Sequence, residues 1–277
     1  MPTVAELLRR CSELSDDSAR RDTEILLCHA LDKPRTWLYT WPESDVEAPR
    51  VQAFDQLLAA RKQGRPVAHL IGRREFWSLN LRVNEHTLIP RPETETLVEW
   101  ALDVAVPEDA EVLDLGTGSG AIALALASER PDWRLSGVDV STLALDVARA
   151  NAAEFDLGAV QFIHSNWFEA LVGRRFHLLV SNPPYVEEGD IHLSTGDLRF
   201  EPLGALMAPQ QGMSDLAKLA RGAPGHLHGD GWLVLEHGHR QGEQVRALLA
   251  EEGFDCIETR RDLAGLERIS GGRWHAQ

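Results

Sequence analysis

The chain has few of the residues that build disulfide-rich or metal-binding proteins. Its 277 residues include only three cysteines, Cys11, Cys28 and Cys256, which are far apart and form no C-x-x-C pair. The sequence therefore supports neither a disulfide framework nor a zinc site. The eleven histidines show no H-E-x-x-H or similar ligand spacing, so we expect no metal.

Long apolar runs are also missing. No stretch approaches the ~20 residues that a membrane-spanning helix requires, and the segment that begins at Met1 lacks the basic-then-apolar pattern of a secretory signal. We therefore expect a cytoplasmic protein with no membrane partner. A content of 43% apolar and 26% charged residues is ordinary for a globular enzyme of one large or two average domains.

An excess of basic residues is absent as well, since the formal net charge is −15. Residues 1–75 contain 12 basic and 12 acidic side chains, whereas residues 76–277 contain 16 basic and 31 acidic ones. An acidic half repels phosphate backbones, so a protein is a better candidate substrate than free nucleic acid. A local basic stripe could still be formed by Arg20-Arg21, Arg61-Lys62, Arg65 and Arg73-Arg74, but a solvated helix face is the favoured interpretation.

A rigid polar turn, Asn182-Pro183-Pro184-Tyr185, follows the apolar run Phe176–Val180. The two prolines fix their own φ angles and cannot donate ladder hydrogen bonds. Asn182 offers one acceptor and one donor, and the main-chain carbonyl of Pro183 adds a second acceptor. With Tyr185 as an aromatic wall, the turn could hold a planar –NH2 group of an amide or a nucleobase. Taken alone, it could also be a local cap at a strand end.

A glycine-rich segment upstream has the pattern of a nucleoside-binding loop. An apolar strand at 112–115 leads into the turn and a helix-forming run follows, which brings backbone N–H groups up to a ligand. The turn ends G-x-G-x-G and lacks a following Gly-Lys-Ser/Thr, so it matches neither a dinucleotide fingerprint nor a phosphate loop. An acid at the end of the next strand could accept hydrogen bonds from both ribose hydroxyls. S-adenosyl-L-methionine is a ligand of this kind. The candidate residues are Gly116, Thr117, Gly118, Ser119, Gly120 and Asp139.

The order of elements indicates an α/β protein with three parts. Residues 1–72 show helical periodicity, with a long helix at Ala48–Lys62, and residues 73–86 alternate as a β-hairpin linker. In residues 87–277 strands and helices alternate, which is typical of a mostly parallel, doubly wound sheet with ligands at the carboxyl ends of its strands. The expected strands are 112–115, 134–139, 160–164, 176–181, 231–236, 255–260 and 267–270. The expected helices of this part are 96–104, 120–129, 141–153, 213–223 and 239–252.

Eight segments carry a resemblance to one family. They are Ala68–Gly72, Arg74–Trp77, Ile89–Glu95, Asp114–Gly120, Ser165–Phe168, Ser181–Tyr185, Arg199–Pro202 and Leu235–Glu243. Together they resemble the release factor glutamine methyltransferases, the HemK/PrmC family. The resemblance implies a small N-terminal helical bundle, a β-hairpin and a Rossmann-like, seven-stranded class I methyltransferase domain. It also implies methyl transfer from S-adenosyl-L-methionine to the side-chain amide nitrogen (N5) of the Gly-Gly-Gln glutamine in bacterial class I peptide chain release factors, with S-adenosyl-L-homocysteine as product.

The resemblance assigns roles to residues of the matching motifs. The catalytic residues would be Asn182, Pro183 and Tyr185, which with Pro184 would also bind the target glutamine. The glycine loop 116–120, Asp139, Trp167 and Asn182 would hold the cofactor. Arg91, Glu93 and Phe76 could cover the substrate, although a structural hinge role is equally open for them. Asn166 stands where similar sequences often have Asp, which implies altered affinity and retained binding, and Glu236 receives no chemical role.

Two alternative functions remain open from the sequence. A DNA or RNA adenine-N6 methyltransferase would use the same Asn-Pro-Pro-Tyr grip, but it should carry an added basic recognition domain, and residues 1–72 are short and neutral. A non-enzymatic adaptor that only binds a nucleoside would not need the turn at all. The expected partner is therefore a release factor, recognised by the N-terminal helices of a monomeric protein.

Overall fold

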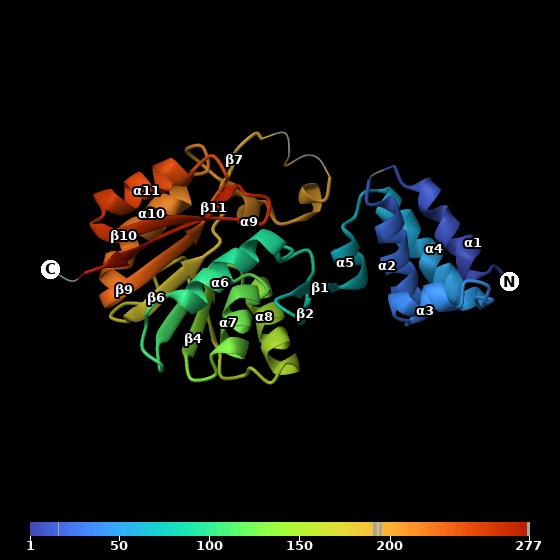
Figure 1. Ribbon diagram of the computed structural model, residues 1–277, viewed down its shortest axis with the longest axis horizontal. Helices are drawn as coiled ribbons and strands as arrows, with labels where there is room; N and C mark the ends of the chain where they lie inside the picture. The colour runs from blue at the N-terminus through green and yellow to red at the C-terminus, as the bar shows by residue number, and fades with distance from the viewer. Residues whose placement is uncertain (16, 191–192, 194–195, 276–277) are drawn as a thin grey trace. The chain divides into compact units, whose positions relative to one another are not determined.

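The computed structural model describes residues 1–15, 17–190, 193 and 196–275. These residues form two compact units (Figure 1). One unit contains residues 1–73 and 196–200, and the other contains residues 74–190, 193 and 201–275. None of the helices within these described ranges is long and apolar enough to cross a membrane.

The first unit is a bundle of short helices. Thr3 and Glu6 form a capping box at its start, in which each side chain accepts a hydrogen bond from the backbone N–H of the other. The bundle core includes Leu26, Phe54 and Leu58, which are fully buried. The helices are α1 (Val4–Leu8), η1 (Arg9–Glu13), α2 (Ala19–Leu31), α3 (Arg35–Thr40), α4 (Ala48–Lys62), α5 (Val67–Ile71) and η4 (Leu198–Phe200). The long helix expected at Ala48–Lys62 is present, whereas α5 was not expected.

The second unit contains a hairpin, β1 (Arg73–Phe76) and β2 (Leu79–Arg82), and a seven-stranded sheet. Within the seven-stranded sheet, all neighbouring strands are parallel except at β11, which runs antiparallel to both of its neighbours. Across the sheet the order is β10 (Phe254–Arg261), β11 (Glu267–Trp274), β9 (Leu227–Glu236), β6 (Phe176–Ser181), β3 (Glu111–Leu115), β4 (Arg134–Asp139) and β5 (Gln161–His164). The expected mostly parallel, seven-stranded fold is confirmed.

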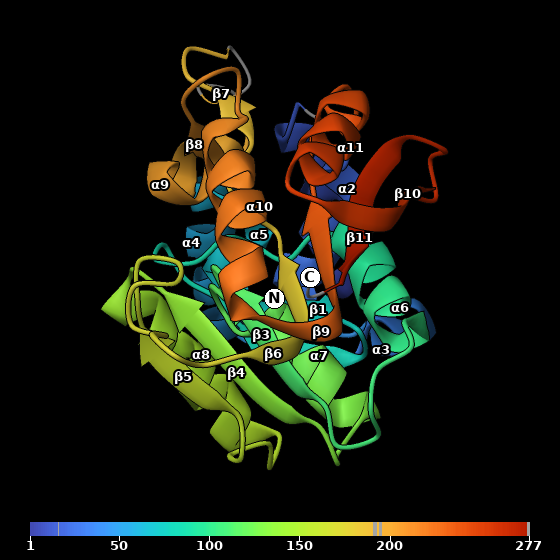
Figure 2. The same cartoon turned by 90° about the vertical axis from the view of Figure 1, so that its left-hand side faces the viewer.

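Helices cover both faces of this sheet because successive strand residues point to opposite sides. In β3, Val112 packs with the core of one face, and Leu113 and Leu115 pack with the core of the other. Figure 2 shows the two layers of helices around the strands. The first face carries α6 (Glu95–Asp103), α7 (Ala121–Glu129) and α8 (Thr142–Glu154), and the second carries α10 (Ser214–His226) and α11 (Gly242–Glu251).

The observed bounds differ most from the expected ones in two strands, because β9 begins at Leu227 and not at 231, and β11 ends at Trp274 and not at 270. The helix expected at 239–252 begins at Gly242, because Gln241 accepts the Gly238 N–H at 2.7 Å and closes a turn before it. The helix expected at 213–223 continues through Pro224 to His226. The turn η2 (Pro92–Thr94) directly precedes α6, and three short elements had no clear sequence signal, namely β7 (Val186–Glu187), α9 (Leu203–Leu206) and β8 (Met207–Ala208).

Candidate active site

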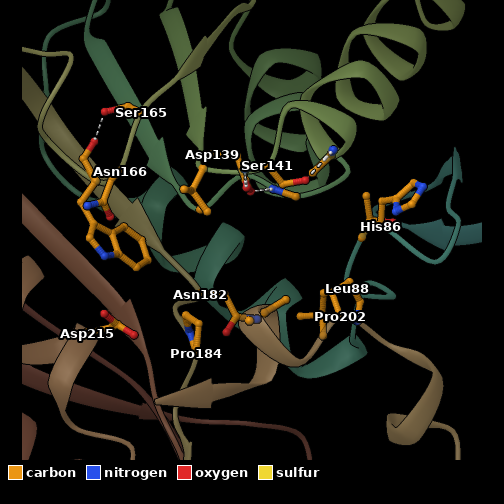
Figure 3. A pocket seen from close by; sticks show the side chains of 18 of the residues that line it. His86, Leu88, Asp139, Ser141, Ser165, Asn166, Asn182, Pro184, Pro202 and Asp215 are labelled. Carbon is orange, nitrogen blue, oxygen red and sulfur yellow. Dashed lines mark hydrogen bonds between the residues drawn. The ribbon is translucent and has the colours of Figure 1, made fainter. Parts of the chain in front are cut away.

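A cavity of about 410 Å³ opens at the carboxyl ends of β3, β4, β5 and β6. Its volume lies within the range of small-molecule sites, roughly 300–1,000 Å³. Figure 3 shows Asp139, Asn166, Asn182 and Pro184 arranged around this space. The lining residues are Glu85, His86, Thr87, Leu88, Gly116, Gly118, Asp139, Val140, Ser141, Ala144, Ser165, Asn166, Trp167, Asn182, Pro184, Pro202, Gly204, Ala205, Asp215 and Lys218.

The glycine loop approaches the cavity with its backbone. Gly116 has a φ of 76°, and a Cβ at this position would lie 3.3 Å from the Trp167 ring. Gly116 and Gly118 line the cavity, whereas the side chains of Thr117 and Ser119 are buried behind the loop. The Thr117 hydroxyl donates to the Asp114 carboxylate at 2.6 Å and so anchors the loop to β3. The loop thus presents backbone atoms, not polar side chains, to a ligand.

Asp139, the last residue of β4, fixes the loop from the neighbouring strand. Its carboxylate accepts the Gly118 N–H at 2.9 Å and the Ser141 N–H at 2.8 Å. Burial raises the pKa of Asp139, and these backbone donors oppose the rise. Because the carboxylate also lines the cavity, it is placed to accept further hydrogen bonds from a bound ligand.

The turn after β5 supplies an aromatic wall and an amide. Trp167 adopts a left-handed φ of 51°, and its carbonyl accepts from the Ser165 hydroxyl at 2.8 Å (Figure 3). Asn166 donates its amide nitrogen to Glu169 at 2.7 Å, which leaves Oδ1 as the atom that can accept from a ligand. Both Asn166 and Trp167 line the cavity.

The Asn-Pro-Pro-Tyr turn forms the opposite side of the cavity. Ser181, the last residue of β6, donates its hydroxyl to the Leu115 carbonyl at 2.6 Å, so the two strand ends are tied together. Asn182 and Pro184 line the cavity, and Pro183 is buried. The amide nitrogen of Asn182 donates to Thr94 Oγ1 at 3.1 Å. The carbonyl end of the Asn182 amide is therefore the end available to a ligand.

A buried carboxylate lies behind this turn. Glu236, at the end of β9, is 1% exposed and accepts from the Tyr185 hydroxyl at 3.0 Å and the Thr94 hydroxyl at 2.7 Å. Burial raises the pKa of Glu236 to about 7, while these two hydrogen bonds act to lower it. Burial and the nearby Glu236 also raise the pKa of Tyr185. Sequence reasoning gave Glu236 no role, since no local motif connects it to Thr94, 142 residues away.

The three residues proposed as a substrate cover lie outside the described cavity lining. Arg91 forms an ion pair with the buried Glu201, which also accepts the Ile89 N–H at 2.9 Å. Glu93 is exposed on η2. Phe76 is 1% exposed and packs in the core of the sheet's first face, so the structure does not bring it to the cavity.

Several lining residues were missed because they come from loops and helix surfaces without a motif. Segment 85–88 contributes all four of its residues to the lining, and α9 contributes the small residues Gly204 and Ala205. On α10, Asp215 (Figure 3) and Lys218 line the cavity and form an ion pair at 2.8 Å. Among the residues that the structure describes, no group of three or more His, Cys, Asp or Glu side chains could hold a metal ion.

Comparison with known proteins gives two matches to family models and many close relatives. The PrmC N-terminal domain matches residues 4–72, and the methyltransferase small domain matches residues 93–200. A release factor glutamine methyltransferase of Pseudomonas aeruginosa is 50% identical over 274 residues, 99% of each chain. Proteins of the same name are 48% identical in Vibrio cholerae, over 94% of this chain and 92% of the relative, and 46% identical in Escherichia coli, over 94% of each.

Solved structures agree on the fold of the second unit. A methyltransferase from Pyrococcus furiosus matches 80% of this chain and 98% of its own, with a TM-score of 0.55 and 16% identity. The hMettl16 catalytic domain, solved with an RNA hairpin, matches 76% of this chain and 82% of its own, with a TM-score of 0.60 and 14% identity. At such identities the likeness concerns the methyltransferase fold alone. The close relatives decide the family, and the chain belongs to the release factor glutamine methyltransferases.

Proposed function

We propose that this protein transfers the methyl group of S-adenosyl-L-methionine to the side-chain amide nitrogen of the Gly-Gly-Gln glutamine in bacterial class I release factors. The observation that carries the proposal is that one cavity is lined by Gly116, Gly118, Asp139 and Trp167 as well as by Asn182. Residues suited to a nucleoside and a residue suited to an amide therefore meet in the same space. A modified glutamine at this motif would modulate translation termination.

The described residues fit the cofactor. Gly116 and Gly118 leave room for a ligand against the backbone, Asp139 can accept from ribose hydroxyls, and Trp167 offers a flat apolar surface. The Oδ1 atom of Asn166 can accept from an adenine amino group, since Glu169 holds the amide nitrogen. When bound, S-adenosyl-L-methionine supplies a methyl group on a positively charged sulfur, which is the electrophile of the reaction.

The target amide is a poor nucleophile because its lone pair is delocalised into its carbonyl. In our proposal Asn182 Oδ1 and the Pro183 carbonyl accept its two N–H groups, which orients the nitrogen and favours the positive charge that develops on it. A nitrogen–carbon bond then forms as the carbon–sulfur bond breaks, and one proton leaves the nitrogen. Oδ1 is available for this task, since Nδ2 donates to Thr94 at 3.1 Å.

Positioning would supply much of the rate. Holding nitrogen and methyl carbon about 3–3.5 Å apart and in line can lower the barrier by about 7–11 kcal/mol. Tyr185 would pack against the plane of the amide, and its hydroxyl is fixed by Glu236 at 3.0 Å. No side chain has to deprotonate the amide before attack.

We propose that the first unit recognises the release factor as a protein. In this proposal the recognition domain comprises residues 1–72, and the hairpin of residues 73–86 joins it to a catalytic domain of residues 87–277. This division is consistent with the family match over residues 4–72. The proposed partner is a cytoplasmic protein, and we propose that the enzyme acts there as a monomer without a direct nucleic acid substrate.

Methyl incorporation tests the proposal. The purified protein is incubated with radiolabelled S-adenosyl-L-methionine and one of three acceptors, namely a release factor, its Gln→Ala variant at the Gly-Gly-Gln site, or duplex DNA. Label on the wild-type factor alone is the expected result. Label on DNA, or equal label on the variant factor, would contradict glutamine methylation and favour an adenine-amine methyltransferase.

A further inference from the structure

Three buried or half-buried side chains form a hydrogen-bonded series that starts at the candidate amide site and ends at a carboxylate. They are Asn182, Thr94 and Glu236. Asn182 Nδ2 lies 3.1 Å from Thr94 Oγ1, and Thr94 Oγ1 lies 2.7 Å from Glu236 Oε2. Thr94 is 4% exposed and Glu236 is 1% exposed, so neither bond competes with bulk water. The three residues come from separate segments, the end of β6, η2 and the end of β9.

The direction of these hydrogen bonds follows from the donor inventory. A carboxylate only accepts, so the Thr94 hydroxyl must donate its single proton to Glu236. Thr94 Oγ1 can then only accept from Asn182, and the NH2 end of the Asn182 amide must face it. A reversed amide would set the oxygen of Asn182 against the lone pairs of Thr94, acceptor against acceptor. The ionised carboxylate therefore determines which end of the amide faces the cavity.

The same carboxylate also holds the side chain of Tyr185, which follows the lining residue Pro184 and does not itself line the cavity. Glu236 Oε1 accepts from the Tyr185 hydroxyl at 3.0 Å, while Oε2 serves Thr94. Tyr185 is fixed at its backbone as well, because its carbonyl accepts from Gln241 at 3.2 Å. The Glu236 carboxylate thus fixes both the orientation of the Asn182 side-chain amide and the position of the Tyr185 ring.

We propose that Glu236 is a positioning residue that acts through Thr94 to present the carbonyl oxygen of Asn182 to the target amide. The inference rests on the proposed function, because it concerns the same reaction. Glu236 itself is not among the residues that line the cavity, so it is not a catalytic group. Its effect is to prevent a donor, the Asn182 NH2, from meeting the N–H groups of the substrate.

Protonation of Glu236 should undo this arrangement. A protonated Glu236 can donate to Thr94, which frees the Thr94 proton for Asn182 Oδ1 and permits the reversed amide. The charged and titratable groups that act on Glu236 are Arg268 on β11, Glu93 on η2 and the Tyr185 hydroxyl. Arg268 favours the ionised form, whereas Glu93 opposes it. We therefore expect turnover to rise with pH as Glu236 ionises.

The test compares four variants of the full chain with the wild type. Glu236→Gln keeps the shape and removes the charge, and Thr94→Val removes the hydroxyl. Thr94→Ser restores a hydroxyl that can make both bonds. Thr23→Val is the matched control, since Thr23 is 0% exposed and its hydroxyl donates to the Ala19 carbonyl at 2.8 Å in the other unit.

Turnover of a release factor is measured from pH 6 to 9, with cofactor affinity measured separately by calorimetry. We expect Glu236→Gln and Thr94→Val to lower kcat by about 10- to 100-fold, with cofactor affinity within threefold of the wild type. Thr94→Ser and Thr23→Val should keep kcat within threefold. The wild-type kcat should rise with a midpoint near pH 7, and Glu236→Gln should lose that rise.

The outcomes separate the positioning role of Glu236 and Thr94 from the proposed methyltransferase function. If the wild type is active and Thr94→Val retains its kcat within threefold, the positioning role is wrong. A Thr94→Ser enzyme as slow as Thr94→Val would also reject it, because the hydroxyl would not be the cause. Should Glu236→Gln fail to fold, the two Thr94 variants still decide the question. A wild type that methylates no release factor refutes the proposed function itself.

Discussion

Asp114 makes the stability of the second unit depend on pH in an unusual direction. Its side chain is fully buried in β3, and Oδ2 accepts from the Thr117 hydroxyl and, at 3.3 Å, from the Ala123 N–H. Oδ1 has no hydrogen-bond partner among the residues that the structure describes. Burial raises the pKa of Asp114 from 3.8 to about 7, although both donors act to lower it.

The size of the effect follows from this shift. Between pH 3.8 and 7 the carboxyl is ionised in the unfolded chain and protonated in the folded one, so the free energy of unfolding falls as the pH rises. One pKa unit corresponds to about 1.4 kcal/mol. From pH 5 to pH 8 the loss from Asp114 is about 2.5 kcal/mol, and it is complete above pH 7. Asp114→Asn cannot ionise and should lose none of it.

Urea unfolding of the cofactor-free wild type and Asp114→Asn at pH 5, 6, 7 and 8 measures this loss. The variant's stability relative to the wild type should increase by about 2.5 kcal/mol across the series, whatever its offset at pH 5. Asp262→Asn is a control of opposite sign. Burial raises the pKa of Asp262, but the Leu266 N–H and Arg268 outweigh it and lower the pKa. This control is therefore also measured at pH 3, and it should lose more stability at pH 7 than at pH 3. A relative stability of Asp114→Asn that stays flat within 1 kcal/mol would refute the reasoning.

Three further substitutions test the site. Asn182→Ala should lower turnover about 100-fold if the side-chain carbonyl of Asn182 acts as proposed, while the cofactor affinity measured by calorimetry should stay within a few-fold of the wild type. Loss of turnover and of cofactor affinity together would mean that Asn182 mainly shapes the cofactor pocket. Gly116→Ala should lower the free energy of unfolding in urea by about 1–2 kcal/mol, because alanine is strained at a φ of 76° and its Cβ would press on Trp167. Cofactor affinity should fall as well. Unchanged stability and unchanged affinity would contradict the close packing of Gly116 against Trp167. Arg91→Ala removes the ion pair between Arg91 and the buried Glu201 and should cost about 1–3 kcal/mol. A second change, Glu201→Gln, should restore part of this loss, and an equally unstable double variant would show that this ion pair is not the cause.

The general position of the cavity could be predicted because its main signals are local. Gly116 and Asn182 each follow directly on an apolar strand, and parallel neighbouring strands end at the same edge of a sheet. The structure places both on one cavity. Asp139 could be found in the same way, since it ends the strand after the glycine loop.

The remaining features depend on contacts that no short pattern encodes. Glu236 looks like an ordinary acid at a strand end, and only the folded chain brings it to Thr94 and Tyr185. Phe76 lies in a segment with a strong family resemblance, yet its burial indicates core packing. The rim at 85–88 comes from a loop whose sequence carries no chemical signal. Distances in sequence of 88 and 142 residues separate the members of the Asn182–Thr94–Glu236 series.

The position of β11 affects the order in which the molecule can fold. This strand lies between β9 and β10, although it follows both in sequence, and Ile269 pairs with Glu236 across the β9–β11 ladder. Until β11 inserts, β9 and β10 have open edges and the backbone beside Glu236 is unpaired. β9 gains its second neighbour only through this step, which involves the last strand of the sheet in the sequence. Protection of the Glu236 region from hydrogen exchange should therefore be among the last signals to appear during refolding, and catalytic activity should report complete folding.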